Sequence, residues 1–280
     1  MLTTGQCATL ACLLEVTAPK PGNVHRGADF EDTSLNDFVA SAVALGPVME
    51  RAERVGATVL QSVQATGQVT RENTNLGIVL LLSPLAVAHR GGDVRNSLAD
   101  VLAAMDAADA VAVYEAIRLA APGGLQPKGE QVATHDVQQD PPDNLLEAMH
   151  EAAHRDLIAK QYNNGFGEIF EEVVPLLEQG DRMTLPQRIV SAHVTLMSRY
   201  PDSLIGRKCG VELATEASVR AAGVLAAGEP GTENYERALA DLDFWLRCDG
   251  HRRNPGTTAD LIAAGLFVLL CENKIKPPFG

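Results

Sequence analysis

A polar loop between residues 20 and 33 brings two kinds of chemical group close together along the chain. Lys20, His25 and Arg26 suit an anion, and the carboxylates that follow suit a hard cation, which takes oxygen ligands. These carboxylates are Asp29, Glu31 and Asp32. The combination favours a site where Mg²⁺ bridges the protein and phosphate oxygens, with a solvated loop whose charges pair with one another as the alternative.

Two polar, glycine-containing segments each precede a strongly apolar run. They are residues 73–77 (Asn-Thr-Asn-Leu-Gly) and residues 254–260 (Asn-Pro-Gly-Thr-Thr-Ala-Asp). Each pattern predicts the start of a buried helix, where free N–H groups and the helix dipole favour an anion. The alternative is plain capping, by Asn73 or Thr74 in the first segment and by Thr257 with Asp260 in a capping box in the second.

Basic residues accompany two predicted helix starts. Arg207 and Lys208 come early in a helix expected to begin after residues 201–203 (Pro-Asp-Ser) and to run to Ala227. Arg252 and Arg253 lie directly before the second polar segment. Cations near a helix N-terminus oppose its dipole, a cost that is accepted where an anionic ligand must be held, although surface cations often occur there.

Residues 150–154 match the zinc-metalloprotease pattern H-E-x-x-H. They fall in a helix expected from about residue 143 to Tyr162, which would place His150 and His154 on one face, with Glu151 to activate water. A zinc metalloprotease is therefore an alternative function. The third ligand would have to come from Glu168, Glu171 or Glu172, and a solvated helix face explains the same residues.

Composition points to one helical protein. The chain has 280 residues, 46% of them hydrophobic and only 4% aromatic, and its periodicity predicts an all-α fold, a single compact domain over 1–280 with about ten to twelve helices. The net charge of −13 argues against a nucleic-acid surface. Five dispersed cysteines, no recognisable signal peptide and no long apolar run predict a cytoplasmic protein without membrane contact. Homo-oligomerisation stays open.

Taken together, the motifs resemble the triphosphoribosyl-dephospho-coenzyme A synthase family over nearly the whole chain. The resemblance rests on residues 20–22 (Lys-Pro-Gly) with the acidic loop, 73–77, 135–137 (His-Asp-Val), 155–159 (Arg-Asp-Leu-Ile-Ala), 201–203 with Arg207 and Lys208, and 254–261. It implies an all-helical fold and a reaction in which ATP loses adenine and its triphosphoribosyl group passes to a ribose hydroxyl of 3′-dephospho-coenzyme A.

The sequence departs from the family pattern in two places. The family loop is close to K-P-G-L-V-D-R-x-N-x-G-x-H-x-D-M, whereas Asn23, His25 and the three acidic residues stand here. The second family motif is N-T-H-K-G, and Asn75 and Leu76 replace its His and Lys, which removes a phosphate-binding charge. The variant loop resembles that of a subgroup in archaea and in methylotrophic or planctomycete bacteria, associated with tetrahydromethanopterin genes.

These observations assign expected roles within a Mg²⁺-dependent ribosyl transfer from ATP. The expected catalytic carboxylates are Asp29, Asp32 and Asp136, and the expected metal ligands are Asp29, Glu31, Asp32 and Asp260. The expected substrate- and phosphate-binding residues are Lys20, Asn23, His25, Asn73, Thr74, Asn75, Arg207, Lys208, Arg253, Asn254, Thr257 and Thr258. Asp202 is one more carboxylate at a motif position. A non-catalytic nucleotide sensor using the same loops is the third functional alternative.

Overall fold

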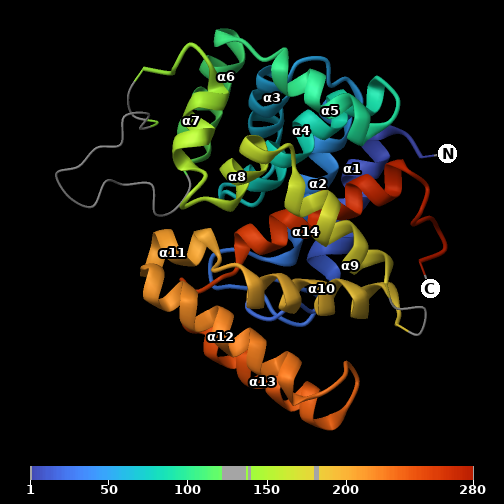
Figure 1. Cartoon of the computed structure of the whole chain (residues 1–280), viewed down its shortest axis with the longest axis vertical. Helices are drawn as coiled ribbons and strands as arrows, with labels where there is room; N and C mark the ends of the chain where they lie inside the picture. Colours follow the sequence, from blue (N-terminus) through green and yellow to red (C-terminus); the bar gives the residue numbers. More distant parts are fainter. Residues whose placement is uncertain (1, 122–136, 138–139, 180–182, 280) are drawn as a thin grey trace.

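The computed structural model describes residues 2–121, 137, 140–179 and 183–279. Within them the chain forms fourteen α-helices, one π-helical turn and one short extended segment (Figure 1). In order these are α1 (Thr4–Thr17), α2 (Leu35–Glu50), α3 (Val55–Gly67), α4 (Leu76–Arg90), α5 (Val94–Ala103), α6 (Ala107–Ala120), α7 (Leu145–Ala152), α8 (Leu157–Asn164), η1 (Ile169–Val173), α9 (Val174–Glu178), α10 (Leu185–Arg199), α11 (Ser203–Cys209), α12 (Val211–Ala227), α13 (Glu233–Arg247), β1 (Cys248–His251) and α14 (Gly256–Cys271).

The all-α fold class is confirmed, but the expected ten to twelve helices is too few. The helix expected to run to Tyr162 is interrupted after Ala152, because Asp156 caps a new helix, α8, with its side chain. The helix expected to run to Ala227 breaks at Gly210, whose φ of 100° is incompatible with a right-handed helix. Hydrophobic periodicity alone does not reveal such breaks, because the apolar spacing continues across them.

Helices α14 and α4 form the centre of the larger core. Residues Leu261–Leu270 of α14 are almost completely buried, and α14 packs against α1, α4, α8, α9, α10 and α11. Figure 1 shows α14 crossing the middle of the molecule. A helix that is apolar on all sides is stable only when other elements surround it. The polar segments before α4 and α14 are therefore attached to the most deeply buried helices of the described fold.

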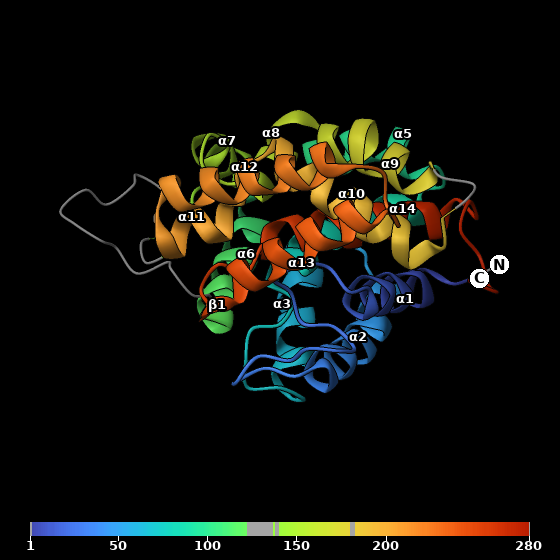
Figure 2. The same cartoon turned by 90° about the horizontal axis from the view of Figure 1, so that it is seen from below.

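A second, smaller cluster lies between α10, α11, α12 and α13. It contains Val194, Ile205, Tyr235, Leu242 and Leu246. Figure 2, seen from below, shows α12 and α13 as a pair lying across the end of the molecule next to α10 and α11. Because α13 also contacts the loop of residues 20–33, this cluster supports one side of the site described next.

Several helices begin with side-chain caps that stabilise their first turn. Ser34 and Asp37 form the capping box of α2, and Asp106 and Asp109 form that of α6. Asp202 caps α11 by accepting from the amides of Leu204 and Ile205 at 2.9 and 3.1 Å. No helix in the described part of the chain is long and apolar enough to cross a membrane.

Candidate active site

A single large cleft of about 1540 Å³ gathers most of the sequence motifs. Its lining comes from α4, α6, α7, α8, α11, α14 and the loop of residues 23–33. Ligand pockets usually measure roughly 300–1,000 Å³, so this cleft has room for more than one small ligand. Of the expected site residues it is lined by Asn23, Asp32, Asn73, Thr74, Asn75, Arg207, Lys208, Asn254, Thr257 and Asp260.

The first and last motifs are joined directly. Asn23 donates from Nδ2 to Oδ1 of Asn254 at 2.6 Å, which ties the early loop to the segment before α14. Gly22 makes the close approach possible: its φ is 75°, and a side chain there would overlap Leu246 and Pro255. The Gly22 amide donates to Asp243 at 2.7 Å, so α13 fixes the loop from its other side.

Lys20 lies beneath the cleft rather than in it. Its ammonium group is 0% exposed and lies 2.8 Å from Oε1 of Glu15, which is itself a cleft-lining residue. The side chain also donates to the carbonyl of Ala18 at 3.5 Å. A buried cation needs such a partner because desolvation is costly. In this arrangement Lys20 holds Glu15 in place and does not reach a phosphate.

The three acidic residues of the loop have different surroundings. Asp29 accepts from the amide of Leu35 at 2.7 Å, at the start of α2, and does not line the cleft. Glu31 is exposed and is also outside the lining. Asp32 lines the cleft, 3.3 Å from Nδ1 of His251, another lining residue. Only Asp32 of the three therefore faces the cleft.

The start of α4 is open to the cleft. Asn73 accepts from the amide of Leu76 at 3.0 Å, which satisfies the first N–H group of the helix. Within the described residues, the amides of Gly77 and Ile78 have no hydrogen-bond acceptor, and both residues line the cleft. The side-chain nitrogen of Asn75, a residue 7% exposed, is also buried without a partner. Such a terminus can receive an anion.

The start of α14 is closed instead by Asp202. Its second carboxylate oxygen accepts from both the amide and the hydroxyl of Thr258, at 2.8 and 2.9 Å. The expected capping box of Thr257 and Asp260 is wrong: Pro255 is the N-cap residue and no side-chain cap bond forms there. Because one carboxylate of Asp202 caps both α11 and α14, it fixes the two helices relative to each other.

The basic pair of α11 points its charge at the cleft. Arg207 forms an ion pair with Asp156, the N-cap residue of α8, and its Nε is buried without a partner. Burial lowers the pKa of the Lys208 ammonium group, and no acidic side chain in the described residues forms an ion pair with it. Lys208 is therefore a cation that an anionic ligand could neutralise.

Asp260 is the least satisfied carboxylate of the cleft. It has no hydrogen-bond donor among the described residues, and burial raises its pKa well above the usual range, reinforced by the charges of Glu15 and Asp202. The carboxylate lies against the first turn of α4, where a side chain on Gly77 would overlap it. A carboxylate held without donors, facing a cleft, is suited to bind a ligand group or to exchange a proton.

Three further expected residues, Arg253, His25 and Thr258, do not line the cleft. Arg253 stacks on Trp245, with its guanidinium carbon 4.6 Å from the ring centroid. His25 accepts from the amide of Gly27 at 3.1 Å, and burial lowers the pKa of its imidazole. The hydroxyl of Thr258 donates to Asp202, so it is already engaged within the protein. Asp136 lies outside the described residues.

The structure does not favour the zinc-protease alternative. Helix α7 ends at Ala152, so His154 lies in the following turn and does not share a helix face with His150. His150 contacts Asn163 at 2.6 Å, and His154 contacts the carbonyl of Glu151 at 2.8 Å. Among the described residues, no three His, Cys, Asp or Glu side chains are grouped so that they could hold a metal ion.

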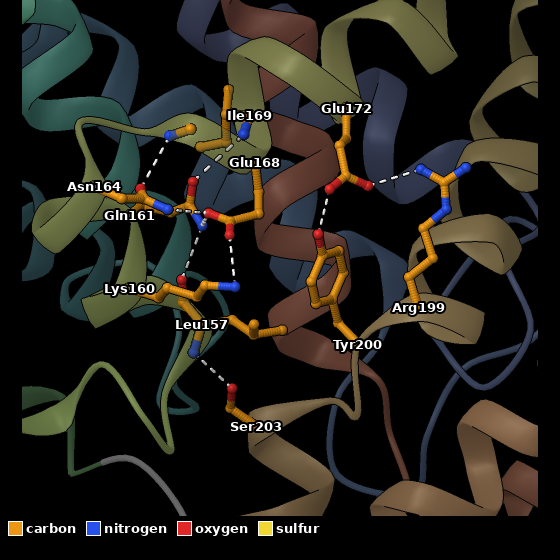
Figure 3. A network of polar contacts seen from close by, with 11 residues as sticks. Leu157, Lys160, Gln161, Asn164, Glu168, Ile169, Glu172, Arg199, Tyr200 and Ser203 are labelled. Atoms are coloured by element: carbon orange, nitrogen blue, oxygen red, sulfur yellow. Dashed lines mark hydrogen bonds and ion pairs between the residues drawn. The ribbon is translucent and has the colours of Figure 1, made fainter.

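A dense polar network fixes the edge of the cleft formed by α8 and the end of α10 (Figure 3). Glu168 accepts from Gln161, Asn164 and Lys160 at 2.8, 2.7 and 2.6 Å. Burial raises the pKa of Glu168, but these hydrogen bonds outweigh it and hold the pKa below its usual range. Lys160 therefore lines the cleft with its charge already paired, unlike Lys208.

Tyr200 and Ser203 complete this edge. Tyr200 donates to Glu172, which also pairs with Arg199 at 2.7 Å, and Ser203 accepts from the amide of Leu157 at 2.8 Å (Figure 3). The short π-helical turn η1 presents Glu172 toward these partners. The network holds α8, and with it Asp156, at a fixed position beside α11.

Sequence reasoning missed several cleft residues. They are Glu15, Arg71, Arg155, Asp156 and His251. Glu15 gave no signal because it lies within an apolar helix. Arg155 and Asp156 stood in a motif without an assigned role, and the side-chain cap that Asp156 supplies to α8 could have been read from its position before an apolar run. His251 lay in a basic run whose individual members were indistinguishable.

Comparisons with known proteins agree on one family. The family model of the ATP:dephospho-CoA triphosphoribosyl transferases matches residues 1–279. No curated protein matches the chain significantly. Among solved structures, the chain is similar to a protein from Archaeoglobus fulgidus described as a triphosphoribosyl-dephospho-coA synthase, with 26% sequence identity and a TM-score of 0.62. The match covers 85% of this chain and 98% of the other.

Proposed function

This chain belongs to the ATP:dephospho-CoA triphosphoribosyl transferase family, and we propose that the cleft between α4, α8, α11 and α14 is where it carries out that reaction. The enzyme transfers the triphosphoribosyl group of ATP to dephospho-coenzyme A and releases adenine. We extend the proposal to a single catalytic domain that works in the cytoplasm, which agrees with five free cysteines.

One observation carries the location of the site. The open amides of α4 and the unpaired ammonium group of Lys208 line the same cleft, together with Arg207. Amides at a helix start and lysine or arginine side chains are the groups that bind polyphosphates in proteins. They supply the charge that the absent lysine at position 76 would have given, since Leu76 stands there. We assign them to the triphosphate of ATP.

The chemistry requires groups on two sides of the ribose. A hydroxyl of the acceptor attacks the anomeric carbon of ATP, the bond to adenine breaks, and adenine leaves with the bonding electrons and takes up a proton. Positive charge develops on the sugar, which a nearby carboxylate stabilises. We assign this role to Asp260 and the removal of the hydroxyl proton to Asp32 with His251, because these side chains face the cleft.

Magnesium fits this donor set as a bridge rather than as a closed protein site. Mg²⁺ is commonly bound by one or two carboxylates together with substrate phosphates. Asp32 and Asp260 are the members of the expected metal set that line the cleft, and Asp260 has no donor of its own in the described residues. Bound there with ATP, the ion would neutralise phosphate charge. Asp29 and Glu31 are less suited, since neither lines the cleft.

The test is release of adenine. The purified protein is incubated with ATP and Mg²⁺, with and without dephospho-coenzyme A, and products are separated by chromatography and weighed by mass spectrometry. We expect adenine only with the acceptor, matched by a triphosphoribosyl mass gain on it. Omitting Mg²⁺ or replacing Asp260 with Asn should abolish both signals, whereas Glu31→Gln, outside the lining, should retain them.

Other outcomes separate the alternatives. Adenine without transfer would mean that the bond is cleaved but that the acceptor is another hydroxyl compound. Binding of ATP with no adenine under any condition would support the nucleotide sensor and would contradict the assignment of a catalytic cleft. Equal activity of Asp260→Asn and the parent would remove Asp260 from the reaction.

A further inference from the structure

One wall of the cleft has a different character from the polar site. Helices α6 and α7 contribute Tyr114, Ile117, Leu145, Ala148, Met149 and Ala152 to the lining, and none of the lining residues from these two helices is charged. Leu145 and Met149 are buried, whereas Ala148 and Ala152 are half-buried and leave the surface shallow. This wall, which we call the α6–α7 wall, offers an apolar surface and no group that would hold a phosphate.

A cation marks the junction between this wall and the polar part. Arg155 lies between the end of α7 and the start of α8, lines the cleft, and has no acidic partner in the described part of the chain. Its neighbour Asp156 is fixed by capping α8 and by pairing with Arg207. The order along the cleft is therefore apolar wall, free cation, then the polar site with Arg207, Lys208 and Asp260.

Dephospho-coenzyme A has a matching order of groups. It consists of an adenosine, a diphosphate and a long uncharged pantetheine arm that ends in a thiol. The ribose that accepts the transfer must lie at the polar site. The diphosphate then falls beside a free cation, and the arm continues onto a surface without charges. A cleft of about 1540 Å³ exceeds the roughly 300–1,000 Å³ of common ligand pockets, as two substrates bound together require.

We propose that the α6–α7 wall is the binding surface for the pantetheine arm of the acceptor, with Arg155 holding the acceptor's diphosphate. The inference rests on the proposed function and adds which part of the cleft selects the acceptor. Removal of the methyl and methylene groups of the arm from water favours binding at this wall. The wall thereby distinguishes dephospho-coenzyme A from other nucleotides that carry the same adenosine and diphosphate.

The experiment combines a wall variant with the isolated arm. Ala148→Glu places a carboxylate on the half-buried wall, and Val111→Glu makes the same kind of change at a 50% exposed position of α6 outside the lining. Initial rates of adenine release give KM for each substrate. The probe 4′-phosphopantetheine, which lacks the nucleoside, is added as an inhibitor. Circular dichroism and the KM for ATP report whether each variant is folded.

We expect 4′-phosphopantetheine to compete with dephospho-coenzyme A and not with ATP. Ala148→Glu should raise the KM for dephospho-coenzyme A and the inhibition constant of the probe at least tenfold, while the KM for ATP stays within about twofold. Val111→Glu should change neither. Arg155→Met should raise the KM for dephospho-coenzyme A in the same direction, also without changing that for ATP.

Three results would overturn the inference. They are competition of the probe with ATP, equal changes in both KM values for Ala148→Glu, and no effect of that variant on the acceptor. Absence of adenine release from the parent would instead contradict the proposed function. In that case, calorimetric titration with 4′-phosphopantetheine still decides the inference, since the parent should bind the probe and Ala148→Glu should not.

Discussion

The starts of α4 and α14 look alike in sequence and differ in what surrounds them. Both are polar, contain glycine and precede a buried apolar helix. At α14, Asp202 accepts from the amide and the hydroxyl of Thr258, so the protein itself closes most of this helix start and only the Thr257 amide lacks an acceptor among the described residues. At α4, the amides of Gly77 and Ile78 have no acceptor among the described residues. One start is a scaffold, and we propose that the other is a ligand site.

A polar helix start therefore does not by itself identify its role. A carboxylate that arrives from elsewhere in the chain converts an anion site into a structural joint, because it supplies the negative charge that a ligand would otherwise bring. Asp202 does this at α14 while also capping α11. Asp260, from the closed start, then faces the open one. The predictions below test this division of roles.

The largest effect is expected where the two starts touch. Gly77→Ala puts a methyl group into the space of the Asp260 carboxylate and close to Ile158. We expect adenine release to fall at least 100-fold and stability to fall by about 1–3 kcal/mol, the usual cost of overpacking. Gly67→Ala is the control, because a methyl group there meets nothing within 4 Å. Activity of Gly77→Ala within threefold of the parent would contradict the contact.

Removing the Asp202 carboxylate from the start of α14 should mainly lower the free energy of unfolding. Asp202→Ala leaves the Thr258 donors and the α11 amides without their acceptor, so we expect a loss of about 2–4 kcal/mol in urea unfolding. Asp93→Ala removes an exposed cap that serves α5 alone and should cost about 1 kcal/mol. Equal losses for the two variants would show that Asp202 does not join two helices.

Removing the charge of Lys208 should weaken binding of the donor substrate, ATP, more than binding of the acceptor. Lys208→Met should raise the KM for ATP about tenfold, or about 1.4 kcal/mol, because a charge-assisted contact to phosphate is lost. Added salt should reduce the difference in the KM for ATP between Lys208→Met and the parent, because salt screens the charge. Lys274→Met is the control, since Lys274 already pairs with Glu178 and Glu272 and lies outside the cleft. An unchanged KM for ATP would show that Lys208 of α11 does not bind the triphosphate.

Removing the cap at the start of α4 should have a smaller effect on stability and on ATP binding. Asn73→Ala removes the acceptor for the Leu76 amide at the exposed entrance of α4. We expect a loss of about 1 kcal/mol in stability, as for other helix caps, and a rise of a few fold in the KM for ATP. Thermal unfolding and initial rates measure the two quantities. A loss of all activity would show that Asn73 contacts the substrate directly.

The smallest effect is expected in the pH dependence of stability, measured without Mg²⁺. Burial and the neighbouring acids raise the pKa of Asp260, so the folded protein binds a proton that the unfolded chain has released. Stability from this group is therefore lost as pH rises above the usual aspartate range. Asp260→Asn should remove that loss and be more stable than the parent at pH 8. A steeper decline in the variant would contradict this.

Much of the helical organisation was predictable because it depends on local patterns. The caps at Ser34 and Asp106 are recognisable from residue types and spacing, since a short side chain reaches amides two or three residues ahead. The breaks after Ala152 and at Gly210 were missed, because apolar spacing continues through them and the capping of α8 by Asp156 was not recognised.

The amino-acid sequence is sufficient to predict an all-helical protein, its transferase family, and the segments that carry polar groups before buried helices. Which of those groups face the cleft depends on the tertiary structure. Lys20 is paired with Glu15 below it, Asp29 holds α2, and Asp202 closes α14. These roles depend on residues distant in the chain. Burying a charge without a partner is costly, yet among the described residues Lys208 forms no ion pair and Asp260 accepts no hydrogen bond, and only the folded arrangement reveals this.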